Sequence, residues 1–296
     1  MRQRSVLWLV VLAGCAGSGS SATPRATPTV VSITADDLRR DLTVFASDSF
    51  EGRETGTPAA FRAARFIAQR LAALGVEPGG DSLYLQRVPL IRDLFEPSTR
   101  IAVTQGGSTM TLAMGSAVVP FINLGPGAPT PKRSAEGDLV FAGYGMTTQG
   151  RKDFEGIKDP GKVIVMLHAA PPGITDSATR TLLESQSELQ QRLLRAIQAR
   201  PAAIVLLMTG PTREFYTQAA PEMMRSVSRA PGDQTTSDAQ RGLPMILLGL
   251  AQPGSPLLPA NWPADDAPQA LAGRRFSARV DIRHEPFTAY NVVGIV

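Results

Sequence analysis

The sequence has little of the side-chain chemistry on which most hydrolytic sites depend. Only one cysteine and two histidines occur among its 296 residues. The cysteine, Cys15, has no possible partner within the chain, so an internal disulfide is excluded and we expect the fold to be stabilised by burial of apolar side chains. Hydrophobic residues make up 43% of the chain, which is ample for a packed core and excludes a disordered protein.

Strong charge patterning is also missing. The net charge is only +4, no block of like charge occurs, and basic residues do not alternate with aromatic ones. Proteins that bind nucleic acid normally show such a basic stripe or patch. We therefore predict no nucleic-acid partner.

The N-terminus, "MRQRSVLWLVVLAGCAGSGSS", has the pattern of an export signal. A basic start is followed by an apolar run from Val6 to Ala13 that is too short to span a bilayer as a mature helix. The order Leu12-Ala13-Gly14-Cys15 resembles the lipobox of bacterial lipoproteins, which implies cleavage before Cys15 and lipidation of its sulfur. We predict a signal peptide over residues 1–15, a flexible tether over 16–32, and an exported lipoprotein anchored to a membrane and facing the periplasm or cell exterior. The alternative is an ordinary signal peptide with an incidental cysteine.

Beyond the tether, helical patterns give way to a β-rich α/β alternation. Thr34 can cap a first helix, and Thr57 with Pro58 predicts a second that ends at Gly75. After Leu90, short β-rich runs alternate with turns, including a hairpin about Gly106-Gly107. Further along, the pattern predicts strands over 162–167, "AAIVLLM" and "LPMILLGL", a helix over 177–199, and one half-exposed strand, "RFSARVDIRHE".

Two groups of segments carry a family resemblance. The string "SDSFEGRETGTP", the helix containing "LAALGVEP" and then "LYLQRVPL" closely resemble, in that order, the N-terminal portion of the co-catalytic zinc aminopeptidases. That family includes aminopeptidase Y, glutamate carboxypeptidase and the transferrin receptor ectodomain. The segments "GDLVFAGYG", "DFEGIKDPGKVIVML" and "ARPAAIVLLM" resemble the protease-associated domain that many of these peptidases carry as an insertion. Arg200-Pro201-Ala202 stands where the family usually has a Gly-Ala pair.

The resemblance implies an α/β fold made of an incomplete zinc-peptidase domain, with its N-terminal helices and edge strands, and an inserted β-rich α/β protease-associated domain. We expect the first part of the peptidase domain over residues 33–92, the inserted domain over 93–286, and a returning strand of the truncated peptidase domain over 287–296. The returning segment, "FTAYNVVGIV", is expected to lie beside "YLQRVPL". The position of the inserted domain fits a lid, a substrate-gating surface or a dimer contact.

In the family, the metal ligands follow the returning strand, so we predict no catalytic and no metal-ligating residue in this chain, and no cofactor bound by it; two zinc ions are expected for the full-length family member. His168 and His284 lack metal-ligand spacing and are interpreted as strand-end or loop histidines. No G-x-S-x-G elbow is present. Glu51, Arg53 and Glu54 lie in a tight loop, either beside an active-site cleft or as a helix-entry loop with a local ion pair.

Three hypotheses about function remain. The first is that the chain is the N-terminal, non-catalytic portion of a secreted, lipid-anchored zinc aminopeptidase that hydrolyses peptides at a two-metal site downstream, and that it is inactive alone. The second is a stand-alone surface lipoprotein whose protease-associated domain binds peptides or a partner protein. The third is an unrelated α/β binding protein.

Overall fold

The computed structural model describes residues 34–121, 132–157, 160–225, 227–232 and 243–296. The chain divides into two compact units, Met1–Ser47 and Asp48–Val296. In the first, helix α1 (Ala35–Phe45) begins with a capping box in which the Thr34 hydroxyl accepts from the backbone N–H of Asp37. Cys15 and the tether over 16–32 lie outside the described residues, so both remain predictions.

The second unit opens with the predicted loop and helix. A short 3-10 segment, η1 (Asp48–Arg53), precedes helix α2 (Pro58–Ala73). The Thr57 hydroxyl accepts a hydrogen bond from the Ala60 N–H at 3.2 Å, and Gly75 follows the helix with a φ of 73°. Since both residues suit the caps they form, the start and end expected for this helix are confirmed.

The strands that the structure describes in the second unit form three sheets. A small sheet pairs β1 (Glu77–Pro78) with β13 (Gly294–Ile295), and a three-stranded sheet has the order β12-β2-β9. The largest sheet has eight strands in the order β4-β3-β11-β6-β7-β8-β10-β5. The bounds of the strands in these two larger sheets are β2 Leu85–Phe95, β3 Arg100–Gln105, β4 Ser108–Thr111, β5 Val118–Pro120, β6 Ser134–Phe141, β7 Val163–His168, β8 Ala203–Met208, β9 Val227–Arg229, β10 Met245–Leu250, β11 Gln269–Arg279 and β12 Ile282–Val292.

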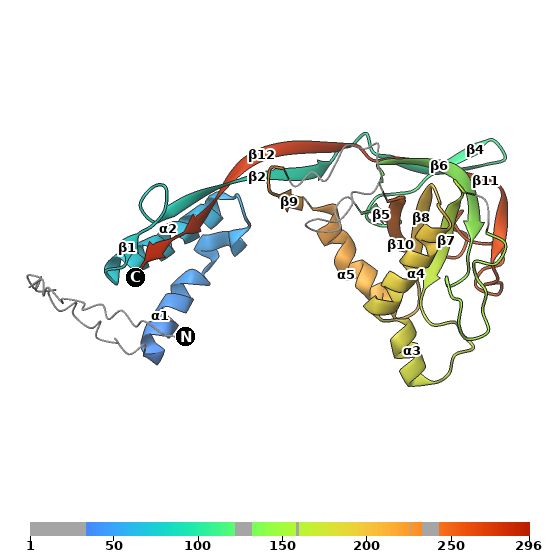
Figure 1. Cartoon of the computed structure of the whole chain (residues 1–296), viewed down its shortest axis with the longest axis horizontal. Coiled ribbons are helices and arrows are strands. Elements are labelled where there is room, and N and C mark those ends of the chain that lie inside the picture. The colour runs from blue at the N-terminus through green and yellow to red at the C-terminus, as the bar shows by residue number, and fades with distance from the viewer. Residues whose placement is uncertain (1–33, 122–131, 158–159, 226, 233–242) are drawn as a thin grey trace, which may run out of the picture. The chain divides into compact units, whose positions relative to one another are not determined.

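The large sheet has a parallel centre and antiparallel flanks. Neighbouring strands among β6, β7, β8 and β10 run parallel, whereas β3, β4, β5 and β11 pair antiparallel. Strands β7 and β8 are buried along their whole length, as expected for continuous apolar strands covered on both faces. Helices α4 (Gln186–Gln198) and α5 (Thr212–Met224) pack on one face of these strands (Figure 1). The other face holds a second apolar core. The predicted mixed α/β fold is therefore confirmed.

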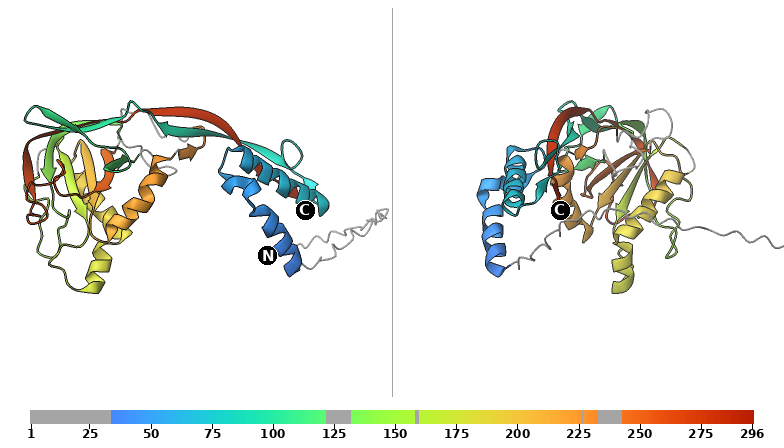
Figure 2. Two further views of the ribbon diagram at one scale, coloured as in Figure 1. Left: turned by 180° about the vertical axis from the view of Figure 1, so that it is seen from behind. Right: turned by 60° about the vertical axis from the view of Figure 1, so that its left-hand side comes forward.

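Strands β2 and β12 form an antiparallel ribbon of eleven pairs, drawn side by side in both views of Figure 2. Tyr290 lies opposite Arg87 and Val292 lies opposite Leu85, so the predicted pairing of the returning segment with "YLQRVPL" is confirmed. The prediction of a single strand over "RFSARVDIRHE" is wrong. This segment is divided between β11 of the large sheet and β12 of the ribbon, because the chain changes sheets between Arg279 and Ile282.

The helices differ from expectation in two regions. The helix predicted over 177–199 is two helices, α3 (Ser177–Leu183) and α4, because the Ser185 hydroxyl caps α4 by accepting from the Glu188 N–H. Helix α5 was not predicted, and it contains Pro221. In the part of the chain that the structure describes, no helix is both long and apolar enough to cross a membrane. The predicted hairpin is confirmed by pairing of Gln105 with Ser108.

Candidate functional site

The loop before α2, which carries the family resemblance, has an unusual backbone. Glu51, Gly52 and Arg53 have φ values of 44°, 73° and 57°. Residues with a Cβ rarely adopt this left-handed region, and such strain often accompanies functional loops. The Glu51 carboxylate pairs with the Arg62 guanidinium at 3.0 Å, but both side chains are largely exposed. The ion pair expected for a helix-entry loop is thus present.

Gly56, at the end of this loop, lies against the β2–β12 ribbon. A Cβ at this position would come within 2.3 Å of the Phe287 ring, and the φ of Gly56 is 81°. The Arg92 guanidinium stacks over the same ring at 4.7 Å and donates to the Thr55 carbonyl at 3.1 Å. Only glycine fits here, because both the space and the backbone conformation exclude a side chain. The ribbon therefore holds the loop in place from both of its strands.

A buried ion cluster joins the ribbon to β9. Asp93 on β2 accepts hydrogen bonds from Arg229 on β9, with Nε 2.8 Å from Oδ2, and its Oδ1 lies 2.6 Å from Nδ1 of His284 on β12. Burial alone would raise the pKa of Asp93, but the hydrogen bonds from Arg229 and His284 outweigh burial and hold the pKa below its usual range. Arg229 Nη1 is buried without a partner among the described residues. The cluster stabilises the junction of three strands.

His168, at the end of β7, is separate from this cluster. Its side chain is 3% exposed, and Nδ1 has no hydrogen-bond partner among the described residues. Burial, together with the charge of Arg192, lowers the pKa of His168 to about 4. The imidazole is therefore neutral near pH 7. Arg192 is itself fully buried, and its guanidinium donates to the carbonyls of Leu167, Ala169 and Leu183.

In α/β proteins, ligands usually bind at the carboxyl ends of parallel strands. In this structure the chain itself partly fills that region. After β6, buried Asp153 accepts from the backbone N–H groups of Tyr144 and Met146, each at 3.0 Å. Arg151 donates to the same carboxylate at 2.9 Å and stacks over the Tyr144 ring at 5.0 Å. Burial, with a smaller contribution from the nearby Asp266, raises the pKa of Tyr144 to about 12. These interactions fix the loop and pair the buried carboxylate of Asp153.

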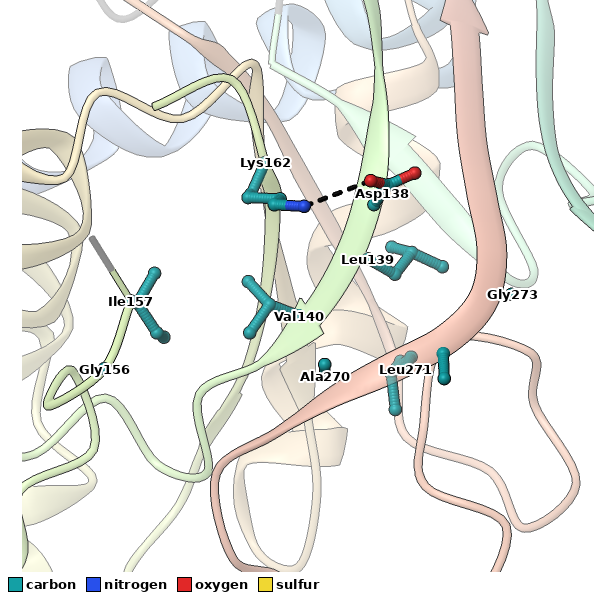
Figure 3. A pocket seen from close by; sticks show the side chains of 10 residues that line it. Asp138, Leu139, Val140, Gly156, Ile157, Lys162, Ala270, Leu271 and Gly273 are labelled. Atoms are coloured by element: carbon teal, nitrogen blue, oxygen red, sulfur yellow. Dashed lines mark hydrogen bonds and ion pairs between the residues drawn. The ribbon is translucent and has the colours of Figure 1, made fainter. Parts of the chain in front are cut away.

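A pocket of about 310 Å³ opens beside β6 and β11 (Figure 3). It forms where these strands part, because four residues of β11, from Leu271 to Arg274, bulge out opposite the single residue Leu139 of β6. An ion pair between Lys162 and Asp138, 3.0 Å from Nζ to Oδ2, lies on one wall. The lining residues are Asp138, Leu139, Val140, Gly156, Ile157, Lys162, Ala270, Leu271, Ala272 and Gly273.

The side chains present do not fit a two-zinc site. Such a site needs several histidines and carboxylates converging on ions about 3.5 to 4 Å apart. Among the described residues, no group of three or more His, Cys, Asp and Glu could hold a metal ion. His284 pairs with a carboxylate that also binds an arginine, and His168 is enclosed in the large sheet.

Sequence reasoning missed most of these features. Asp93 and Arg229 gave no signal, because neither belongs to a recognisable motif and they meet only through the pairing of β2 with β9. The pocket was missed because it depends on a bulge in β11. One available signal was Gly273, which lies inside an otherwise alternating strand pattern and has a φ of 72°.

Comparisons with known proteins give matches in structure alone. No protein family model and no curated protein sequence matches this chain. A zinc aminopeptidase from Bacillus subtilis aligns over 86% of this chain and 46% of its own, with 15% identity and a TM-score of 0.33. A peptidase M28 precursor from Shewanella amazonensis SB2B aligns over 87% of this chain and 52% of its own, with 11% identity and a TM-score of 0.37. The chain thus spans about half the length of these two structures.

Proposed function

We propose that this chain is the N-terminal, non-catalytic portion of an exported zinc aminopeptidase that is anchored to a membrane by lipidation of Cys15. In this proposal, residues 93–286 include an inserted protease-associated domain, and a two-metal site in residues that follow Val296 hydrolyses peptides from their N-termini. The observation that carries the proposal is the ordered set of segments that resemble the family, from "SDSFEGRETGTP" to "FTAYNVVGIV".

The β2–β12 ribbon supports an insertion. The chain leaves along β2 and returns along β12, so the residues between Phe95 and Ile282 begin and end in one ladder. The returning chain then pairs again, through β13, with β1. An inserted domain is expected to leave and rejoin its host in this way, because its two ends must meet within the host sheet.

The contact between Gly56 and Phe287 also supports the proposal. The loop that carries the resemblance packs on a residue of the returning segment, with Arg92 of β2 stacked on the same ring. The parts assigned to the peptidase domain from both ends of the chain are therefore in contact. In the proposal, this chain would position the loop and the inserted domain, while residues outside it would supply the metal ligands and the general base.

The test compares two products of the same reading frame. Residues 16–296 and a longer protein, extended by about two hundred downstream codons, are purified, and zinc content and hydrolysis of leucine p-nitroanilide are measured for each. We expect about two zinc ions per chain and turnover only in the extended product. Stoichiometric zinc with turnover in residues 16–296, lost on replacing His168 or His284, would overturn the proposal.

The same reading frame distinguishes the proposed function from its alternative. A stop codon after Val296 would favour a stand-alone surface lipoprotein whose protease-associated domain binds peptides or a partner protein. In that case the extended product would not exist in the cell, and the pocket beside β6 would become the leading candidate for function.

A further inference from the structure

The pocket beside β6 and β11 combines an aliphatic floor with one charged wall (Figure 3). Val140 and Ile157 contribute partly buried aliphatic side chains, and Ala270 is exposed beside them. The residues that line the pocket include no aromatic ring. A ligand would therefore fill the floor with an aliphatic group, without the stacking that a nucleobase or a sugar ring normally uses.

The charged wall has unused hydrogen-bonding capacity. Lys162 Nζ carries three protons, and its hydrogen bond to Asp138 Oδ2 uses one of them. The second carboxylate oxygen of Asp138 forms an ion pair with Nη1 of Arg275 at 3.6 Å, which is beyond hydrogen-bonding distance. The side chains of Lys162 and Asp138 are 35% and 57% exposed, so a ligand can reach both. The wall thus offers a donor and an acceptor side by side.

A neutral amide matches this wall better than an ion does. A carboxylate ligand would be attracted by the Lys162 ammonium but repelled by Asp138. An ammonium ligand would be attracted by Asp138 but repelled by Lys162. In an extended peptide, the N–H and the C=O of one residue point to the same side, so that residue can bind both side chains while their ion pair stays intact. The volume of about 310 Å³ is at the small end of the range for ligand pockets, and suits one or two residues.

We propose that this pocket binds a short, extended peptide segment with aliphatic side chains. Lys162 donates to a peptide carbonyl, Asp138 accepts from a peptide N–H, and an aliphatic side chain lies on the floor made by Val140, Ile157 and Ala270. The bulge in β11 opens the site, and Gly273 within the bulge adopts a φ of 72° that a residue with a Cβ resists. The inference goes beyond the proposed aminopeptidase and does not rest on it.

The probe is the blocked peptide N-acetyl-Ala-Val-Leu-amide, titrated into the ¹⁵N-labelled full chain while amide chemical shifts are followed. We expect saturable shifts at Gly156, Gly273 and Leu139. The probe has no free N-terminus, so an aminopeptidase cannot consume it. Failure of this binding test is therefore distinguishable from failure of the proposed peptidase activity.

Two variants and their matched controls test the contacts. Ala270→Trp fills the exposed side of the pocket and should abolish the shifts, whereas Thr109→Trp, on an exposed strand of the same sheet, should not. Lys162→Met should weaken binding about tenfold, the effect of one hydrogen bond from a charged donor. Lys152→Met breaks another exposed lysine–carboxylate pair, 3.3 Å from Glu155, outside the pocket and should leave binding unchanged.

Three outcomes would overturn the proposal. They are the absence of saturable shifts at millimolar probe, equal loss of binding in a variant and its control, and equally tight binding of acetate or methylammonium. The last outcome would identify a site for ions, with no role for the peptide group.

Discussion

Acidification should destabilise the large sheet through His168. Its imidazole is almost fully buried, and its pKa falls from the ordinary value of 6.5 to about 4. The unfolded chain therefore takes up a proton below about pH 6.5, whereas the folded chain does so only near pH 4. Between these values the unfolded state binds more protons, so the free energy of unfolding decreases as the pH falls. Above about pH 6.5 the imidazole is neutral in both states, so the free energy of unfolding keeps its full value there.

The magnitude follows from the same two values. One pKa unit corresponds to about 1.4 kcal/mol, so the free energy of unfolding should fall by about 1.4 kcal/mol per pH unit in this window and by about 3 kcal/mol across all of it. His168→Phe removes the titrating group at similar size. Any change in packing that the phenyl ring causes shifts the stability of this variant equally at each pH.

The assay is urea denaturation followed by fluorescence of Trp262, which packs against the apolar core of the large sheet. Curves for the wild type and His168→Phe are measured between pH 7.5 and 4.5. We expect the wild type to show the steep pH dependence and His168→Phe to lack about 1.4 kcal/mol per unit of it. Parallel pH profiles for the wild type and His168→Phe would refute the reasoning.

Three further predictions concern packing and export. Gly56→Ala should lower the free energy of unfolding by about 1–3 kcal/mol, because its Cβ would overlap the Phe287 ring; the double variant with Phe287→Ala should regain part of the loss in urea denaturation. Arg192→Met should cost about 3 kcal/mol, since it leaves three buried carbonyls unpaired; Arg195→Met, at a partly exposed site, should cost less by the same assay. Cys15→Ser should release the protein from the membrane fraction of a bacterial host, and mass spectrometry of the wild-type N-terminus should find a lipidated cysteine; an unmodified, soluble wild type would contradict this.

Local signals in the sequence were enough to predict several elements of the fold. Thr57 and Gly75 fix the ends of α2 through caps that involve residues only a few positions away. The apolar runs at β7, β8 and β10 indicate buried strands, and Gly106-Gly107 indicates the turn between β3 and β4. The same local rules failed for α5, whose internal Pro221 reads as a break in a helix.

The candidate sites depended on contacts between distant parts of the chain. Asp93 binds Arg229 and His284, which lie 136 and 191 residues away along the sequence. The pocket likewise joins Lys162 and Asp138 to a bulge more than a hundred residues further on. Neither residue type nor spacing predicts such meetings, because any one of the 26 acidic residues could in principle have paired with any basic one.

The sequence by itself therefore determined the α/β class, the caps of α2 and the apolar strands, since these depend on interactions over a few residues. It also determined that side chains for a two-zinc site are scarce, because the chain has two histidines. Only the tertiary structure decided that Gly56 packs on Phe287, that His168 is buried, and that β11 parts from β6 to open a pocket. The physical reason for the first and the last of these is strand register: a shift of one residue in β12 or β11 would reverse the faces of their side chains without changing any local signal.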